Sequence, residues 1–410
     1  MGDSPTVLTR RRLLQSGGVG AAALLLPALP AAIAEATATP TAAGIAADPM
    51  GRGYWIAMSD GRVIPRGNAT RVGGAPAFSG TATGIAAVTK GGGFWRLQGN
   101  GRTTGVGTAT LRGGALSNRD SRVVGAAPTP SGRGMWRVTS KGTVVATGTA
   151  PVLGEPRTDF PIVGIAAHPE AGGYWLLNSR GRVFAYGASR VLGTPVGSGA
   201  TGIASHPSGD GYWVVRSTGI VSAFGVAAHH GNANLDSPIV DIAPAPDGAG
   251  YWLLTRDGRV RPFGSARTGI FSIDPPPAPT VATVGGIVVD SAIASRLRGL
   301  LAHARDDGFR LGGWGYRSYQ RQVELREQNC GPRYYDVYVK RSSECSPMTA
   351  RPGASMHEQG RAIDFHRIRA DGTVAPIAGT AAFRWMAVNA KAYGLYNLPA
   401  EPWHWSTNGR

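Results

Sequence analysis

The sequence predicts a multidomain protein, in which an all-β repeat domain is followed by an α+β domain. Three observations predict this: a tryptophan that recurs every 38 to 41 residues, a proline-rich stretch after the last recurrence, and a change of hydrophobic period from 2 to 3.6 beyond it. A chain of 410 residues is long enough for two or more domains.

Each of the six repeats carries an aromatic residue or methionine directly before its tryptophan. The pairs are Tyr54-Trp55, Phe94-Trp95, Met135-Trp136, Tyr174-Trp175, Tyr212-Trp213 and Tyr251-Trp252. In the fourth repeat, the β-rich runs 162–167, 173–177 and 181–187 are separated by turn residues. Asp60-Gly61 and Asp257-Gly258 lie between two such runs, where a tight hairpin turn needs a positive φ.

A period near 40 residues with three or four strands is typical of a propeller blade. We therefore expect a six-bladed β-propeller over residues 43–271, with a β-solenoid or a non-closing array as the alternative. The repeats also resemble the tandem Gly-Tyr-Trp repeats of exported actinobacterial proteins. A tryptophan that recurs beside apolar residues favours packing between blades over a sugar-binding surface.

The N-terminus is expected to be an export signal over residues 1–36. Residues 9–15, Thr-Arg-Arg-Arg-Leu-Leu-Gln, resemble the twin-arginine motif, and an apolar stretch from Val19 to Ile33 follows. Cleavage is expected after Ala34 or Ala36. A retained anchor is the alternative, but the stretch is short and rich in Ala, Gly and Pro. The mature protein is thus expected to be secreted or associated with the cell wall, without a transmembrane anchor.

The chain is strongly basic, with a formal net charge of +17 at pH 7, and lysine occurs only at Lys90, Lys141, Lys340 and Lys391. An arginine-rich composition fits coding bias, and it also fits attraction to an anionic cell-wall polymer through the repeats. Nucleic acid is not an expected partner, because the sequence has no basic run and no aromatic RNA-binding motif.

A proline-rich linker over residues 272–281 separates the repeats from an α+β domain over residues 282–410. In that domain residues 291–305 carry Ala, Leu and Arg at helical spacing, with Ser291 as the candidate cap. Residues 319–328 predict a second helix.

Three segments of the α+β domain carry the residues expected for hydrolytic zinc chemistry. They are 315–322 (GYRSYQRQ), 355–365 (SMHEQGRAIDF) and 401–405 (EPWHW). His357, Asp364 and His404 offer two imidazoles and a carboxylate, which is the number of protein ligands that a catalytic Zn²⁺ takes beside water. Glu401 is the expected general base for the zinc-activated water, and Arg317 the cation for the developing oxyanion.

On a strand, Gly360, Ala362 and Asp364 would share one face, whereas Ile363 and Phe365 would point to the core. Glu358 is expected to be solvated. His366 would share the face of Asp364, as a residue behind the ligands, a substrate contact or a further ligand.

The three segments, in this order, resemble the D-alanyl-D-alanine carboxypeptidase family of zinc peptidases, over roughly residues 283–407. The family is similar in fold to the hedgehog signalling domain. The resemblance implies that His357, Asp364 and His404 bind zinc, that Glu401 is the base and that Arg317 stabilises the transition state. It also implies that Ser355, Tyr319 and Gln322 line the substrate pocket.

Cys330 and Cys345, the only two cysteines, are expected to form a disulfide in an oxidising compartment, worth about 3 kcal/mol in the chain-entropy model. They lie in an extra loop expected to form one wall of the substrate cleft.

The expected function is cleavage of peptide bonds next to D-alanine in peptidoglycan stem peptides. The alternatives are an endopeptidase that cuts between L-Ala and D-Glu, and an inactive wall-binding protein. The repeats would bind wall glycan or protein, or act as a spacer.

Overall fold

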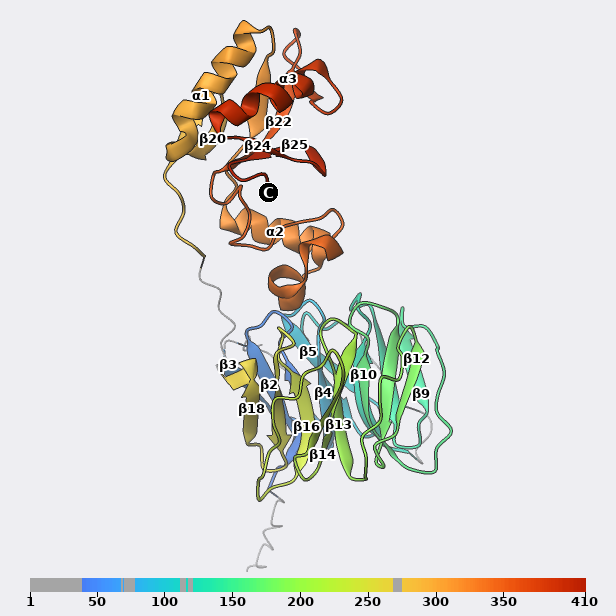
Figure 1. Ribbon diagram of the computed structural model, residues 1–410. Coiled ribbons are helices and arrows are strands. Elements are labelled where there is room, and N and C mark those ends of the chain that lie inside the picture. Colours follow the sequence, from blue (N-terminus) through green and yellow to red (C-terminus); the bar gives the residue numbers. More distant parts are fainter. Residues whose placement is uncertain (1–38, 68, 70–77, 111–115, 117–120, 268–274) are drawn as a thin grey trace, which may run out of the picture. The chain divides into compact units, whose positions relative to one another are not determined.

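The computed structural model describes residues 39–67, 69, 78–110, 116, 121–267 and 275–410 (Figure 1). The expected export signal, residues 1–36, lies outside the described residues. None of the helices in the described part of the chain is long and apolar enough to span a membrane.

Residues 42–264, which we call the repeat region, form six three-stranded antiparallel sheets, each with its strands in chain order. The strands are β1 (Ala42–Ala47), β2 (Gly53–Met58), β3 (Val63–Gly67); β4 (Ala82–Ala87), β5 (Gly93–Gln98), β6 (Thr103–Gly107); β7 (Val123–Pro128), β8 (Gly134–Thr139), β9 (Val144–Gly148); β10 (Ile162–Ala167), β11 (Gly173–Asn178), β12 (Val183–Gly187); β13 (Ala200–Ser205), β14 (Gly211–Arg216), β15 (Val221–Gly225); and β16 (Ile239–Pro244), β17 (Gly250–Thr255), β18 (Val260–Gly264). A short 3₁₀ turn, Ser265–Arg267, follows β18.

The first strands of the six sheets contact one another in chain order, and β16 of the last sheet contacts β1 of the first. The aromatic side chains follow the same order. Trp175 packs against Tyr212 of the next sheet with ring centroids 5.5 Å apart, and Trp252 of the last sheet packs against Tyr54 of the first at 5.1 Å.

All six repeated tryptophans are at most 1% exposed, so the prediction that they fill the packing between sheets is confirmed. Large aromatic side chains at these positions remove the most apolar surface from water per residue. The predicted tight turns are confirmed as well, with φ values of 84° at Gly61 and 87° at Gly258.

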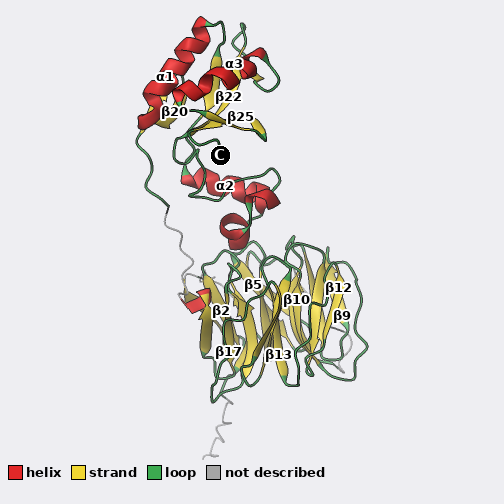
Figure 2. Ribbon diagram, in the orientation of Figure 1, coloured by secondary structure: helices red, strands yellow, loops and turns green. Residues whose placement is uncertain are grey.

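Residues 281–406 combine helices with small sheets, and we call residues 281–410 the C-terminal region (Figure 2). Its elements are β19 (Val281–Val284), β20 (Ile287–Asp290), α1 (Ser291–Asp306), β21 (Leu311–Trp314), α2 (Tyr319–Cys330), the π-helical turn η2 (Tyr335–Val339), the 3₁₀ turn η3 (Ser342–Glu344), β22 (Ala362–Ile368), β23 (Val374–Pro376), α3 (Ala381–Asn389), the 3₁₀ turn η4 (Ala390–Tyr393), β24 (Tyr396–Leu398) and β25 (Glu401–Ser406).

Both predicted helices of the C-terminal region are present, but the cap of α1 is not the expected one. The carboxylate of Asp290 accepts a hydrogen bond of 2.9 Å from the backbone N–H of Ala292, whereas Ser291 is already the first helical residue. An oxygen at the position before the helix reaches the free N–H groups of the first turn, which Ser291 cannot do from inside it. Helix α2 is capped by Ser318, which accepts from the N–H of Arg321.

The main sheet of this region has the order β21-β22-β25-β24, with β23 paired to β22. Ile363 and Phe365 of β22 are at most 1% exposed and pack with residues of α1 and α3, as predicted from the alternation. The core therefore lies on one face of the sheet, and the intervening residue Asp364 is on the other. The expected disulfide joins Cys330 at the end of α2 to Cys345.

Candidate active site

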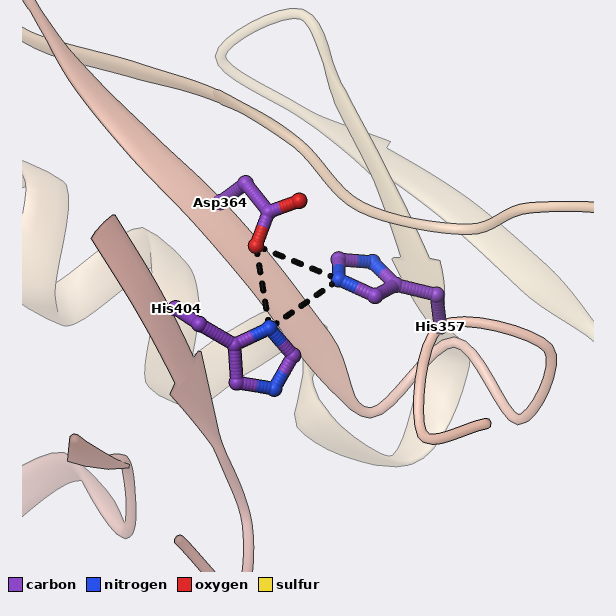
Figure 3. A group of neighbouring side chains, drawn as sticks. All are labelled: His357, Asp364 and His404. Carbon is purple, nitrogen blue, oxygen red and sulfur yellow. Dashed lines mark hydrogen bonds and ion pairs between the residues drawn. The ribbon is translucent and has the colours of Figure 1, made fainter. Parts of the chain in front are cut away.

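The structure brings the three predicted ligands together in the C-terminal region (Figure 3). Asp364 on β22 and His404 on β25 are directly opposite each other in the antiparallel register, so their side chains leave the sheet on the same face. His357 comes from the turn that precedes β22.

The distances between the three ligand atoms match a tetrahedral metal site. Nε2 of His357 lies 3.2 Å from Oδ1 of Asp364 and 3.2 Å from Nδ1 of His404, and the last two atoms are 3.0 Å apart. Two ligands bound tetrahedrally to zinc at about 2.0 Å would be about 3.3 Å from each other. The donor set and its spacing therefore fit Zn²⁺.

Backbone carbonyls fix both imidazole rings. Nδ1–H of His357 donates to the carbonyl of Gly315 at 2.7 Å, and Nε2–H of His404 donates to the carbonyl of Arg410 at 3.0 Å. Each ring thereby turns its other nitrogen, with its lone pair free, toward the shared centre. Such outer hydrogen bonds are the usual way in which proteins orient histidine ligands.

The electrostatics of the group keep Asp364 ionised. Burial acts to raise the pKa of Asp364, but hydrogen bonds and charge interactions with His357 and His404 outweigh it and hold this pKa well below its ordinary value. Burial acts to lower the pKa of His404, and the hydrogen bond to Asp364 reverses this and raises the pKa. A dense set of donors with one fixed negative charge is suited to a cation.

Arg317 lies beside this group and is itself held in place. One of its nitrogens, Nη1, donates to Oε1 of Gln322 at 3.0 Å, and Nη2 is 3.9 Å from Oδ2 of Asp364. Gln322, only 1% exposed, donates in turn to the carbonyl of Ala350 at 2.8 Å. Burial lowers the pKa of Arg317 from its ordinary value and Asp364 opposes this, so the guanidinium remains a positioned cation.

The ligand group opens into a cleft of about 610 Å³. Of the predicted site residues, the cleft is lined by Arg317, Gln322, Ser355, Glu401 and the three ligands. Tyr319 is not among the lining residues, and its hydroxyl is buried in the protein interior. The structure therefore does not place Tyr319 in the cleft, in contrast to the expectation. Residues 347–350 of the predicted extra loop also line the cleft.

Glu401 begins β25, three residues before His404, and lines the cleft. Its carboxylate forms no hydrogen bond or ion pair with another of the described residues. Its negative charge acts to raise the pKa of His404 and opposes the lowering of the pKa of Arg317 by burial. A carboxylate without a fixed partner, beside the ligand group, is available to exchange a proton.

Residues 286–410 match the model of VanY, the D-alanyl-D-alanine carboxypeptidase family. The matched residues include the three candidate ligands together with Arg317 and Glu401, and the match supports a peptidase of this type in the C-terminal region. One similar solved structure is VanYB in complex with D-alanine-D-alanine, with 25% identity, 32% of this chain and 81% of that chain covered, and a TM-score of 0.25. No curated protein matches this chain.

Glu358, which was expected to be solvated, is instead 7% exposed. Its carboxylate accepts hydrogen bonds from the backbone N–H groups of Gly353 at 3.0 Å and Ser355 at 3.2 Å. Burial raises the pKa of Glu358, and these hydrogen bonds act against the rise. The expectation was wrong because the turn that carries His357 folds back on itself and encloses the carboxylate. The sequence did contain a signal for the burial of Glu358, because this charged residue lies between the candidate ligand His357 and a turn at Gly360.

His366 lies on the ligand face of β22 but is not a member of the ligand group. Its ring packs against Trp314 with centroids 4.6 Å apart, and its Nδ1 is buried without a hydrogen-bond partner among the described residues. Burial lowers the pKa of His366. His366 is therefore not placed as a further ligand. The other two expected roles, a contact with substrate and a position behind the ligands, remain predictions.

Proposed function

We propose that this chain is an exported zinc metallopeptidase that hydrolyses D-alanine-containing stem peptides of peptidoglycan, as a D-alanyl-D-alanine carboxypeptidase. The observation that carries the proposal is the group of His357, Asp364 and His404, spaced for a tetrahedral ion, in a cleft that also contains Glu401 and Arg317. The match of this region to VanY supports the same reaction.

In this mechanism His357, Asp364 and His404 hold the metal, with each imidazole turned by its backbone carbonyl. A zinc ion held there would supply acidification of water, to a pKa of about 7, and polarisation of the scissile carbonyl. Glu401 accepts the proton of the attacking water and delivers it to the leaving amine. Arg317, fixed by Gln322, donates hydrogen bonds to the oxyanion that develops on the carbonyl.

We further propose that the repeat region is a closed six-bladed β-propeller within a domain over residues 43–271, followed by a linker at 272–281 and the peptidase domain at 282–410. Support comes from the cyclic order of the contacts between first strands, including β16 with β1. Closure leaves the first and last sheets no open face, which accounts for the buried Trp252 beside Tyr54. The high positive charge favours cell-wall polymers as partners of this domain.

Mass analysis of purified muropeptides after digestion tests the proposed reaction. A pentapeptide stem that ends in two D-alanines should lose one alanine, and a chelator should abolish the loss until zinc is returned. A stem split between its first two residues would instead identify an endopeptidase. A folded, zinc-loaded protein that leaves all stems intact would contradict both readings and favour a wall-binding role.

A further inference from the structure

Trp314 lies in the same row of the sheet as two of the metal ligands. Its backbone is directly opposite Asp364 in the β21–β22 pair, and Asp364 is directly opposite His404 in the β22–β25 pair. Residues opposite each other in an antiparallel sheet point to the same face. The side chains of Trp314, Asp364 and His404 therefore leave three neighbouring strands on one side.

The two glycines before Trp314 confirm which face this is. A Cβ placed on Gly313 would come within 2.6 Å of Ile363 Cγ2, which belongs to the core. A Cβ placed on Gly312 would come within 2.5 Å of His366 Nε2, on the opposite face. Since side chains alternate along a strand, Trp314 shares the face of Gly312 and His366. Gly312 is required here because the ring of His366 occupies the space above it.

Trp314 is 64% exposed, because its side chain leaves the sheet on the side opposite the core of this region. It is not among the residues that line the cleft, and β21 is the last strand of its sheet on this side. The ring of His366 lies against it at 4.6 Å with an angle of 52° between the planes. An exposed indole with a second ring packed against it presents a flat apolar surface of fixed orientation.

We propose that Trp314, supported by His366, is a binding subsite for the part of a peptide substrate that extends beyond the cleft and over β21. This inference rests on the proposed peptidase function and concerns the length of its substrate. The ligand class is an extended peptide, whose aliphatic side chain packs on the indole.

The dimensions of the sheet determine which residue of the substrate peptide contacts Trp314. Neighbouring strands are about 4.8 Å apart, so Trp314 stands about one strand spacing from Asp364 and two from His404. An extended peptide advances about 3.3–3.6 Å per residue. The indole therefore meets a residue about two positions from the scissile bond, which a dipeptide does not possess. Trp314 thus favours longer stem peptides over free dipeptides.

Binding to an inactive full chain tests this subsite. In a Glu401→Gln background loaded with zinc, we would measure the affinity for D-alanyl-D-alanine and for a stem pentapeptide with the same terminus. Trp314→Ala should weaken pentapeptide binding by about tenfold, in line with the worth of an aromatic contact, and leave dipeptide binding unchanged. Trp314→Phe should recover part of the loss. His366→Phe should retain more affinity than His366→Ala, since it keeps a supporting ring.

The control is Val388→Ala, which alters another exposed apolar side chain, on α3, away from this face. It should bind both peptides as the parent does. If Trp314→Ala weakened both peptides equally, or neither, the subsite would be refuted. Failure of the proposed function would look different: the wild-type chain would cut no stem peptide, while the binding ratio would still decide whether Trp314 contacts peptide.

Discussion

Histidines of the repeat region and of the C-terminal region serve different purposes. His168 stacks on Trp175 and His206 packs at an angle of 43° against Trp213, each with ring centroids 5.5 Å apart, and burial lowers the pKa of both. His404 is as buried as His206, but the hydrogen bond to the carboxylate of Asp364 at 3.0 Å raises its pKa. The carboxylate of Asp364, which His404 shares with His357, therefore distinguishes a candidate metal site from histidines that serve packing.

The two regions are also built differently. The repeat region places equivalent residues at equivalent positions six times, so its buried groups serve packing between similar sheets. The C-terminal region instead brings single residues from a turn, β22 and β25 to one point. We therefore expect substitutions in the repeat region to change stability, and substitutions around Asp364 to change chemistry.

The largest expected effect is on turnover, from Glu401→Gln. Glutamine keeps the size of the side chain but cannot accept a proton, so turnover should fall by about 10²–10⁴-fold, the usual worth of a positioned base. Zinc content should be unchanged. Glu401→Asp should recover only part of the rate, because its carboxylate is withdrawn by one methylene. Steady-state release of D-alanine measures both; near-full activity of Glu401→Gln would assign the base elsewhere, and His366 would be tested next.

In the repeat region, Trp213→Ala should lower the free energy of unfolding by about 3–5 kcal/mol, because a fully buried indole leaves a cavity. The turnover of the protein that remains folded should not change. Denaturant unfolding followed by tryptophan fluorescence gives the first quantity, and activity per zinc-loaded chain gives the second. A fall in activity per loaded chain would show that the two regions are not independent in function.

Glu358 is predicted to matter through the turn that carries His357. Glu358→Ala would remove the acceptor of the N–H groups of Gly353 and Ser355, and that of Ser355 lies in a buried residue, so the cost should be about 1–3 kcal/mol in local stability. We expect weaker zinc binding, measured by competition with a chromogenic chelator. Glu358→Gln should restore part of the affinity, since it retains one acceptor oxygen. Equal zinc affinity in wild type and Glu358→Ala would show that the turn holds without this carboxylate.

The smallest expected effect concerns Asp241, which stands where the other five first strands carry glycine at positions 44, 84, 125, 164 and 202. Its carboxylate accepts from the N–H groups of Ile45 and Ile242 at 2.9 Å, and burial raises its pKa to about 6 despite these bonds.

Because the folded state binds this proton more tightly than the unfolded state, the contribution of Asp241 is favourable below about pH 4 and is lost as the pH rises through about 6. Asp241→Gly should flatten the pH dependence of the unfolding free energy between these values, by at most about 3 kcal/mol. Denaturant titrations of both proteins at pH 4.5 and pH 7 measure the difference. An unchanged slope would mean that Asp241 keeps an ordinary pKa.

Period and alternation made much of this molecule predictable from sequence. The six tryptophans, the two helices of the C-terminal region and the inward positions of Ile363 and Phe365 follow from spacing alone. The capping role of Asp290 and the burial of Glu358 do not, because each depends on how a turn closes. The buried hydroxyl of Tyr319 does not either, because it depends on how α2 packs against its neighbours. Trp314 was not predicted either, since only the pairing register shows that it shares a row with Asp364 and His404.

The most direct test of the central claim is the zinc content of the purified chain and of two variants, measured by elemental analysis. If His357, Asp364 and His404 form the metal site, wild type and Glu401→Gln should each bind one zinc per chain, and His404→Ala should lose most of it. Full zinc occupancy in His404→Ala would contradict the account, as would loss of zinc in Glu401→Gln, which would make Glu401 a ligand in place of Asp364.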